Sequence, residues 1–347
     1  MTKLIHRAVH DIVPTRPFHF DSTFFKPAHF PSNDMKWAEH GGKRWQTMLF
    51  RGERLGVVFE NAGTAKNPKV KVAIYSQKKL SPEFIDSVKN EVIWRYNLNL
   101  DLSGFYKDAG KDPLLNPIIK KFRGLRPMHA GSLYEYLIID IVLQNATVRR
   151  SVSMMQALFE NYGTLLEFAG QKLWCFWEPK VLAGASEQKL RDLKMGYRAK
   201  SLIKVSQAFV FSRQTFLEQD ATKNTRSCKN GNLRFDEFKL RRASVEEQEK
   251  ALISLYGIGP ASAGYIMFDA FHQWDFLKHI SPWEQKIYNK IFFNKDWEKE
   301  LVPVEKMLKH FNRWGKWKNL AIHYVWENIW WQRRNQNIPW LEKLIRL

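Results

Sequence analysis

The first hundred residues place apolar side chains in short runs separated by polar breaks. Three of these runs, residues 44–50, 54–60 and 69–76, are rich in Val, Phe, Tyr and Trp. Arg51-Gly52-Glu53 separates the first two runs, and the polar residues 61–68 separate the last two. This pattern predicts antiparallel hairpins.

Two further elements are predicted around these strands. Ser81 offers a capping hydroxyl and Pro82 suits the first helical position, so a helix should run from there to about Tyr96. The aromatic segment from Phe18 to Lys26 has two interpretations, a buried edge strand or an exposed contact surface, and we favour the buried strand.

Beyond residue 100 the apolar positions follow a helical period. A helix is predicted over residues 112–122, and Leu133 to Leu143 is a nearly continuous apolar run. That run is too short to span a membrane, so it predicts a buried core helix. Residues 213–243 are polar and predict a solvated insertion whose basic side chains could contact a polyanion. Ser244 and Glu247 then have the spacing of a capping box.

The C-terminal region from Phe311 to Arg334 is dense in aromatic residues spaced three and four apart. Packing on a helix face requires this spacing, so most of these rings should lie in the core. One or two are expected to line a pocket for a flat ring instead. The pocket candidates are Tyr324 and Trp326, with Trp283 from an earlier helix and Glu327 as a charged neighbour.

The stretch from Leu252 to Ile291 has the most specific pattern. An apolar helical face ends at Leu255, Gly257-Ile258-Gly259-Pro260 makes a tight turn, and a helix of small and apolar residues follows. Glycine permits positive φ and leaves backbone N–H groups uncovered. Those groups at a helix N-terminus form a site for a phosphate. Ser281-Pro282-Trp283-Glu284 then starts another helix with a capping-box pattern.

Composition narrows the class of protein. The chain has 347 residues with 44% hydrophobic residues and 14 tryptophans, which predicts a folded protein of two domains. A net charge of +20 favours a polyanionic partner. Only Cys175 and Cys228 are present, so we expect a reducing compartment, no disulfide framework and no iron–sulfur cluster. With no apolar run near ~20 residues, a cytoplasmic location (nuclear in a eukaryote) without membrane contact is predicted.

Four motifs in this order resemble the helix-hairpin-helix DNA glycosylase superfamily. They are F-R-G-L-R at 122–126, Q-N-A-T-V at 144–148, G-Y-R-A-K at 196–200 and L-Y-G-I-G-P at 255–260. The β-rich front end resembles the 3-methyladenine glycosylase II and 8-oxoguanine glycosylase branches. The resemblance covers residues 112–335 well and 15–100 loosely.

The resemblance implies an α+β fold and binding of double-stranded DNA by a monomer associated with the nucleoid. An N-terminal antiparallel β-rich domain over residues 1–100 would precede a mostly helical glycosylase domain over 101–347. The hairpin would grip one DNA phosphate, often with a bound monovalent cation such as K⁺ or Na⁺. No metal ligand set and no other cofactor is expected.

The resemblance also assigns DNA contacts. Asn145 would fill the gap left by an extruded base, Tyr197 would wedge beside the orphaned base, and Arg198 would hydrogen-bond to it. The phosphate grip would come from Gly257, Gly259 and the amides that follow, including Ala261. The structural alternative is that Asn145 belongs to a helix end and Tyr197 packs in the core.

Base release needs a carboxylate near the sugar, because cleavage of a glycosidic bond builds positive charge there. The family's aspartate position falls at Ser281, which cannot carry that charge. Glu284 lies one helical turn on and could reach back, or could merely complete the capping box. Asp275 and Asp269 are weaker candidates, and Glu327 could act from across the pocket.

The family's lyase members carry a lysine where this chain has Ala261, which cannot be a nucleophile. We therefore expect a monofunctional glycosylase that uses water and leaves an abasic site. The alternative from another class is a non-catalytic reader of damaged or modified DNA. The sequence does not specify which base is excised. The aromatic residues suit electron-poor alkylated purines, and a bulky modified base of foreign DNA is the other possibility.

Overall fold

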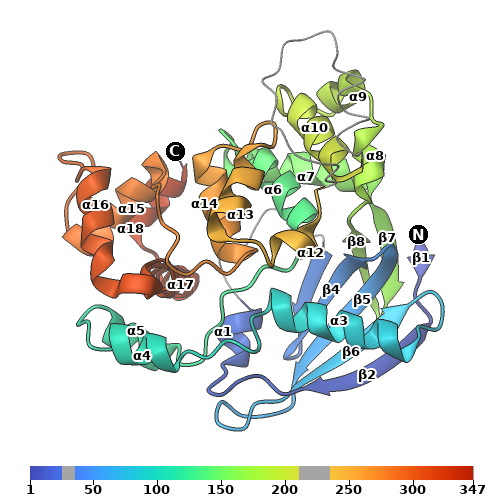
Figure 1. Cartoon of the computed structure of the whole chain (residues 1–347), viewed down its shortest axis with the longest axis horizontal. Coiled ribbons are helices and arrows are strands. Elements are labelled where there is room, and N and C mark those ends of the chain that lie inside the picture. Colours follow the sequence, from blue (N-terminus) through green and yellow to red (C-terminus); the bar gives the residue numbers. More distant parts are fainter. Residues whose placement is uncertain (26–35, 211–234, 347) are drawn as a thin grey trace.

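The computed structural model describes residues 1–25, 36–210 and 235–346. Its N-terminal part is a five-stranded antiparallel sheet in the order β2-β6-β5-β4-β3, as the apolar runs predict. The helix α3 (Pro82–Arg95) packs on this sheet (Figure 1), and the Ser81 hydroxyl accepts a hydrogen bond from the Phe84 N–H at its start. The strands are β2 (His6–Ile12), β3 (Trp37–His40), β4 (Lys43–Phe50), β5 (Glu53–Asn61) and β6 (Val70–Ser76).

The segment near Phe18 was predicted to be a buried edge strand. The prediction is wrong about the secondary structure and correct about the burial of its aromatic side chains. Residues Phe20–Phe24 form a short helix, α1, because the His19 side chain accepts a hydrogen bond from the Ser22 N–H and caps it. Phe24 is fully buried and its ring stacks on that of Tyr96 with centroids 4.6 Å apart. The aromatic side chains of this segment therefore fill the space between the sheet and α3.

A second, three-stranded sheet was not predicted. The strands β7 (Thr164–Phe168) and β8 (Gln171–Cys175) come from the middle of the chain, and β7 pairs in parallel with β1 (Thr2–Lys3). Phe168 packs so closely on the large sheet that a Cβ on Gly56 would lie 2.3 Å from its ring. Residues 164–175 therefore join the N-terminal sheets, although the sequence places them inside the helical domain.

The helices form two apolar cores (Figure 1). The first surrounds the buried helix α6 (Leu133–Leu143), whose bounds agree with the predicted core helix. It also contains α7 (Val148–Tyr162), α8 (Pro179–Ala183), α9 (Glu187–Asp192), α10 (Arg198–Val210), α13 (Val245–Ile253) and α14 (Pro260–Asp269).

The second core combines helices from two distant parts of the chain, so α4 and α5 pack with the C-terminal helices. The helix predicted over 112–122 is present but shorter. The members are α4 (Ser103–Ala109), α5 (Leu115–Lys121), α15 (Pro282–Phe293), α16 (Val304–Phe311), the 3₁₀ segment η1 (Asn312–Trp317), α17 (Lys318–Asn335) and α18 (Pro339–Arg346). No helix in the described ranges is long and apolar enough to cross a bilayer.

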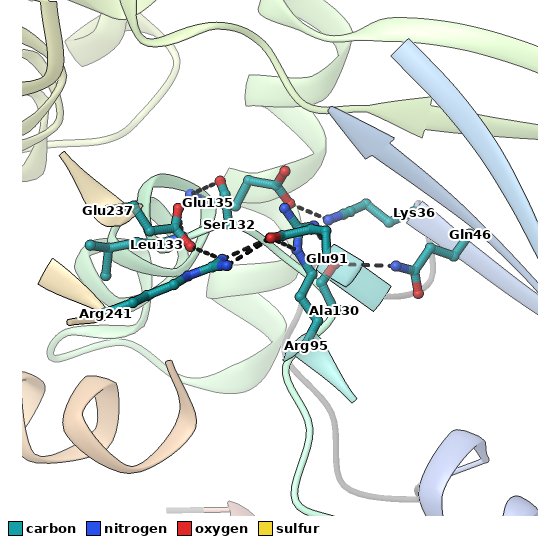
Figure 2. A network of polar contacts seen from close by, with 10 residues as sticks. All are labelled: Lys36, Gln46, Glu91, Arg95, Ala130, Ser132, Leu133, Glu135, Glu237 and Arg241. Atoms are coloured by element: carbon teal, nitrogen blue, oxygen red, sulfur yellow. Dashed lines mark hydrogen bonds and ion pairs between the residues drawn. The ribbon is translucent and has the colours of Figure 1, made fainter. Parts of the chain in front are cut away.

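A network of buried and half-buried charges joins the N-terminal part of the chain to the first helical core (Figure 2). Glu91 on α3 pairs with Arg95 at 2.7 Å and with Arg241 at 2.7 Å. Arg241 follows the short helix α12 (Glu237–Leu240) and also pairs with Glu237, while Glu135 on α6 pairs with Lys36. Burial raises the pKa of Glu91, but Arg95 and Arg241 outweigh it and lower that pKa to about 2.

The prediction of a solvated insertion over residues 213–243 can be compared with the structure only at its end, because residues 211–234 lie outside the described part of the chain. There, the side chains of Arg241 and Glu237 are only 8% and 12% exposed. Pairing makes this partial burial of charge possible, and polarity alone does not reveal the pairing. The capping box predicted at Ser244 and Glu247 is confirmed at the start of α13.

Candidate active site

The turn between α13 and α14 depends on its two glycines in different ways. Gly257 has φ +85°, and a Cβ there would lie 2.6 Å from the Ser201 hydroxyl. Gly259 precedes the first residue of α14, and a Cβ built on it would have no neighbour within 4 Å. No side chain caps α14, so its first N–H groups face an open surface and are available to an anion.

The Gln144 side chain, whose contact with this turn the sequence analysis missed, holds the turn through a hydrogen bond. The Gln144 amide donates to the Gly257 carbonyl at 2.8 Å and lies 3.5 Å from both Asp140 and Ser262. Burial raises the pKa of Asp140 to about 6, although hydrogen bonds from Ser262 and Gln144 oppose the shift. Asp140 lies in the middle of an apolar run, and only the contact with α14 indicates its role.

Three predicted DNA contacts meet beside the turn. Asn145 has φ +48° and an exposed side chain, and its amide nitrogen lies 3.3 Å from the Tyr197 hydroxyl. Tyr197 is 52% exposed, so it does not pack in the core. The Arg198 guanidinium instead points inward and is only 7% exposed. It donates to the Gln144 carbonyl and lies 4.7 Å from the centroid of the Tyr197 ring.

The candidate carboxylate folds back onto the start of its own helix. Glu284 Oε2 accepts hydrogen bonds from the Ser281 backbone N–H and from the Ser281 hydroxyl, both at 2.9 Å. The predicted capping box is therefore present. The geometry also brings the Glu284 carboxylate to within hydrogen-bond distance of Ser281, the position that the resemblance assigns to the aspartate.

Two tyrosines surround this carboxylate, and the sequence analysis did not single them out. The Tyr288 hydroxyl donates to Glu284 Oε1 at 3.2 Å, and the Tyr265 hydroxyl on α14 donates to the Ser281 hydroxyl oxygen at 3.3 Å. Burial and then the charge of Glu284 raise the pKa of Tyr288 well above its ordinary value. The pKa of Tyr265 is raised by the same two causes. Both phenols therefore stay protonated donors at neutral pH.

The other acidic candidates lie in different surroundings. Asp275 is exposed in the loop after α14. Asp269 is at the C-terminal end of α14 and accepts a hydrogen bond from Tyr136. Glu327 is 2% exposed, with its carboxylate 3.7 Å from His323. Among the acidic candidates, the structure therefore places only Glu284 in contact with Ser281.

The aromatic candidates divide between surface and core. Trp283 is 38% exposed and packs edge-on against Trp326 on α17, with ring centroids 5.5 Å apart. Both lie beside the start of α15. Tyr324 is fully buried and its hydroxyl donates to the Leu125 carbonyl at 2.9 Å, so it is a core residue rather than part of an open pocket. No cluster of three or more His, Cys, Asp or Glu that could hold a metal ion occurs in the described ranges.

The candidate site thus combines an uncapped helix N-terminus, an exposed Asn–Tyr pair and a carboxylate beside aromatic rings. The family described as HhH-GPD superfamily base excision DNA repair protein matches residues 138–329. More than half of the chain lies within this match, and the chain belongs to this superfamily. It is a DNA-binding DNA glycosylase of base excision repair.

Individual relatives agree with this assignment. The chain is 22% identical to a DNA-3-methyladenine glycosylase of Bacillus subtilis over 75% of this chain and 82% of that protein. It is 26% identical to an N-glycosylase/DNA lyase of Saccharomyces cerevisiae over 68% of this chain and 65% of that protein. The structure of a 3-methyladenine DNA glycosylase from Archaeoglobus fulgidus has a TM-score of 0.68 at 15% identity, covering 92% of this chain and 98% of that one. The predicted α+β fold class is confirmed.

Proposed function

We propose that this protein is a monofunctional glycosylase that extrudes an alkylated purine from duplex DNA and hydrolyses its glycosidic bond. The observation that carries the proposal is the position of the Glu284 carboxylate, 2.9 Å from the Ser281 backbone N–H. A negative charge held there would stabilise the positive charge that develops on the deoxyribose as the base leaves.

The proposed reaction is a balanced hydrolysis. The bond between C1′ and the base nitrogen breaks, and its electron pair leaves with the base. Water then forms the new bond to C1′ and releases one proton to the solvent. Because the alkylated purine is cationic while it is bonded to the sugar, the products are a neutral free base and an abasic site. Glu284 balances charge in this scheme and forms no covalent bond. A monovalent cation at the hairpin stays a prediction of the resemblance.

Two features support water as the nucleophile and an alkylated purine as the substrate. Ala261 on α14 has no amine, and nearby Lys278 is paired with Glu249 at 2.6 Å. Trp283 and Trp326 offer aromatic surface beside the carboxylate. An alkylated purine carries positive charge and is attracted to such rings. The Bacillus subtilis relative is named a DNA-3-methyladenine glycosylase, which agrees with this substrate class.

The test compares Glu284→Gln with the wild type on a duplex that carries one 7-methylguanine. The substitution keeps the size of the side chain and removes its charge, so single-turnover base release should slow about a hundredfold or more. Affinity for the duplex should change little. Glu187→Gln, which alters an exposed pair with Arg191, serves as the control.

Two results would contradict the proposal. Equal rates for Glu284→Gln and the wild type would remove Glu284 as the carboxylate. The second result is a wild-type protein that binds DNA but releases no base. If it fails on duplexes that carry 7-methylguanine or 8-oxoguanine and on methylated bulk DNA, the protein is a reader of damaged DNA.

A further inference from the structure

The capping box alone does not account for how the Glu284 carboxylate is held. Its Oε2 atom accepts from the Ser281 backbone and hydroxyl. Its Oε1 atom accepts from the Tyr288 hydroxyl at 3.2 Å. In a capping box the glutamate side chain makes only one contact, with the backbone N–H of the cap residue. The bond from Tyr288 is therefore an additional contact, made across one turn of α15 by a residue four positions later.

Packing fixes the donor itself. Tyr288 is 5% exposed, and its ring packs edge-on against Phe292 and Phe311, each with centroids 5.6 Å away. A phenol held in this way has little rotational freedom to lose when it donates a hydrogen bond. The hydroxyl can therefore serve as a fixed point for a flexible carboxylate.

A second chain of donors reaches the other carboxylate oxygen. The Tyr265 hydroxyl on α14 donates to Ser281 Oγ at 3.3 Å, and Ser281 Oγ donates to Glu284 Oε2 at 2.9 Å. Tyr265 thus orients the Ser281 hydroxyl so that its hydrogen points at the carboxylate. With both oxygens occupied by donors, the plane of the carboxylate is defined.

We infer that Tyr288 is a positioning residue that acts through Glu284 in base release. The physical reason is the extra torsion of glutamate: a carboxylate anchored through one oxygen can still rotate, whereas donors on both oxygens hold it. A charge that is oriented before the reaction costs no reorganisation during it. This inference rests on the proposed function, because it assumes that Glu284 supplies the charge.

The first test is Tyr288→Phe, which removes one hydroxyl and keeps the packed ring. Single-turnover release of 7-methylguanine should slow roughly tenfold, the effect of losing a hydrogen bond to a charged group. Affinity for the duplex should stay as it is.

Tyr134→Phe is the matched control. Tyr134 is also buried, and its hydroxyl bonds to the Ser206 hydroxyl at 2.7 Å in the first helical core. The control should lose comparable thermal stability without any change in the rate of base release. An equal loss of rate in both variants would mean that Tyr288 supports only the fold, and would overturn the inference.

A double-mutant cycle separates the inference from the proposed function. If Tyr288 acts through Glu284, Tyr288→Phe should have no further effect once Glu284→Gln is present. A slow Glu284→Gln in which Tyr288→Phe still costs its full tenfold would overturn the inference and leave the proposed function standing. A Glu284→Gln as fast as the wild type would overturn the proposed function itself, whatever Tyr288→Phe does.

Discussion

A glutamate three residues after a helix cap can reach the position of a carboxylate at the cap itself. In this protein Ser281 supplies the cap, and Glu284 bends back to accept from its backbone N–H. The arrangement follows from ordinary capping chemistry, which satisfies an N–H group that the first helical turn leaves unpaired. One side chain, that of Glu284, can therefore both cap the helix and, on the proposed function, supply the negative charge beside the sugar.

Restoring an aspartate at Ser281 should hinder the reaction. In Ser281→Asp the introduced carboxylate would lie beside that of Glu284, and the two like charges would repel each other and displace Glu284. Single-turnover base release should therefore fall several-fold. Ser281→Ala is the control, with about 1 kcal/mol of stability lost as the cap is removed. A faster Ser281→Asp would show that Glu284 was not in the productive position.

The absence of an amine at Ala261 leads to a prediction about the product. DNA released by the wild type should carry intact abasic sites, and borohydride should trap no protein–DNA adduct. Ala261→Lys provides a positive control for the trapping chemistry. A strong adduct with the wild type would mean that another amine attacks the sugar, and the monofunctional assignment would then be wrong.

At the scale of elements, the two glycines of the hairpin between α13 and α14 differ in how much space surrounds them. Gly257 is required by its positive φ and its contact with Ser201, whereas Gly259 has open space around it. The first is needed for the turn to form. The second leaves the N-terminus of α14 accessible, and this is the part of the hairpin that would meet a phosphate.

The two glycines should consequently respond differently to substitution. Gly259→Val should keep its stability and lose at least tenfold in affinity for duplex DNA, because the side chain would cover the amides. Gly257→Ala should be destabilised by about 1–3 kcal/mol through strain and close contact. Thermal unfolding and a binding titration at fixed salt measure both. If the folded Gly259→Val variant binds as well as the wild type, the hairpin does not grip DNA.

At the scale of the whole molecule, the buried charges of Glu91, Arg95 and Arg241 tie the N-terminal sheet to the helical part (Figure 2). Removing the Glu91 charge takes away the ion pair of the buried Arg95 and leaves Arg241 paired with Glu237 alone. Glu91→Gln should therefore cost about 3–5 kcal/mol of unfolding free energy. Lys89, which pairs with Asp86 on the exposed side of the same helix, offers a control in Lys89→Gln, for which less than about 1 kcal/mol is expected.

Acid should destabilise the fold in two steps. Burial and then Arg241 lower the pKa of His272 in the folded protein to about 3. As the pH drops below about 6.5, this histidine takes up a proton in the unfolded chain before it does so in the folded protein. The free energy of unfolding therefore falls from about pH 6.5 downward. Each such group contributes a slope of about 1.4 kcal/mol per pH unit. Glu91, with its pKa near 2, adds a loss below about 4.5. His272→Asn suits the positive φ at this position and should flatten the first step in denaturant titrations.

The elements that local patterns specify strongly were predictable. The hairpins, the helix after Ser81, the core helix from Leu133 to Leu143 and both capping boxes all follow from neighbouring residues, and all are present. The pairing of β1 with β7 was not predictable, because it joins residues more than 160 positions apart. The antiparallel pairing of β7 with β8 is local and was missed. A strand was predicted in place of the helix α1, because an isolated aromatic run does not distinguish a strand from a helix.

The amino-acid sequence by itself determined the superfamily, the hairpin with its two glycines, and the substitution of serine for the expected aspartate. These are properties of local spacing and residue type. Only the tertiary structure decided that the Glu284 carboxylate is held through both oxygens, that Arg198 points inward to a carbonyl, and that Glu237 and Arg241 form a largely covered ion pair. Each of these depends on partners brought together by packing, and the energy of a charge or a donor depends on those partners.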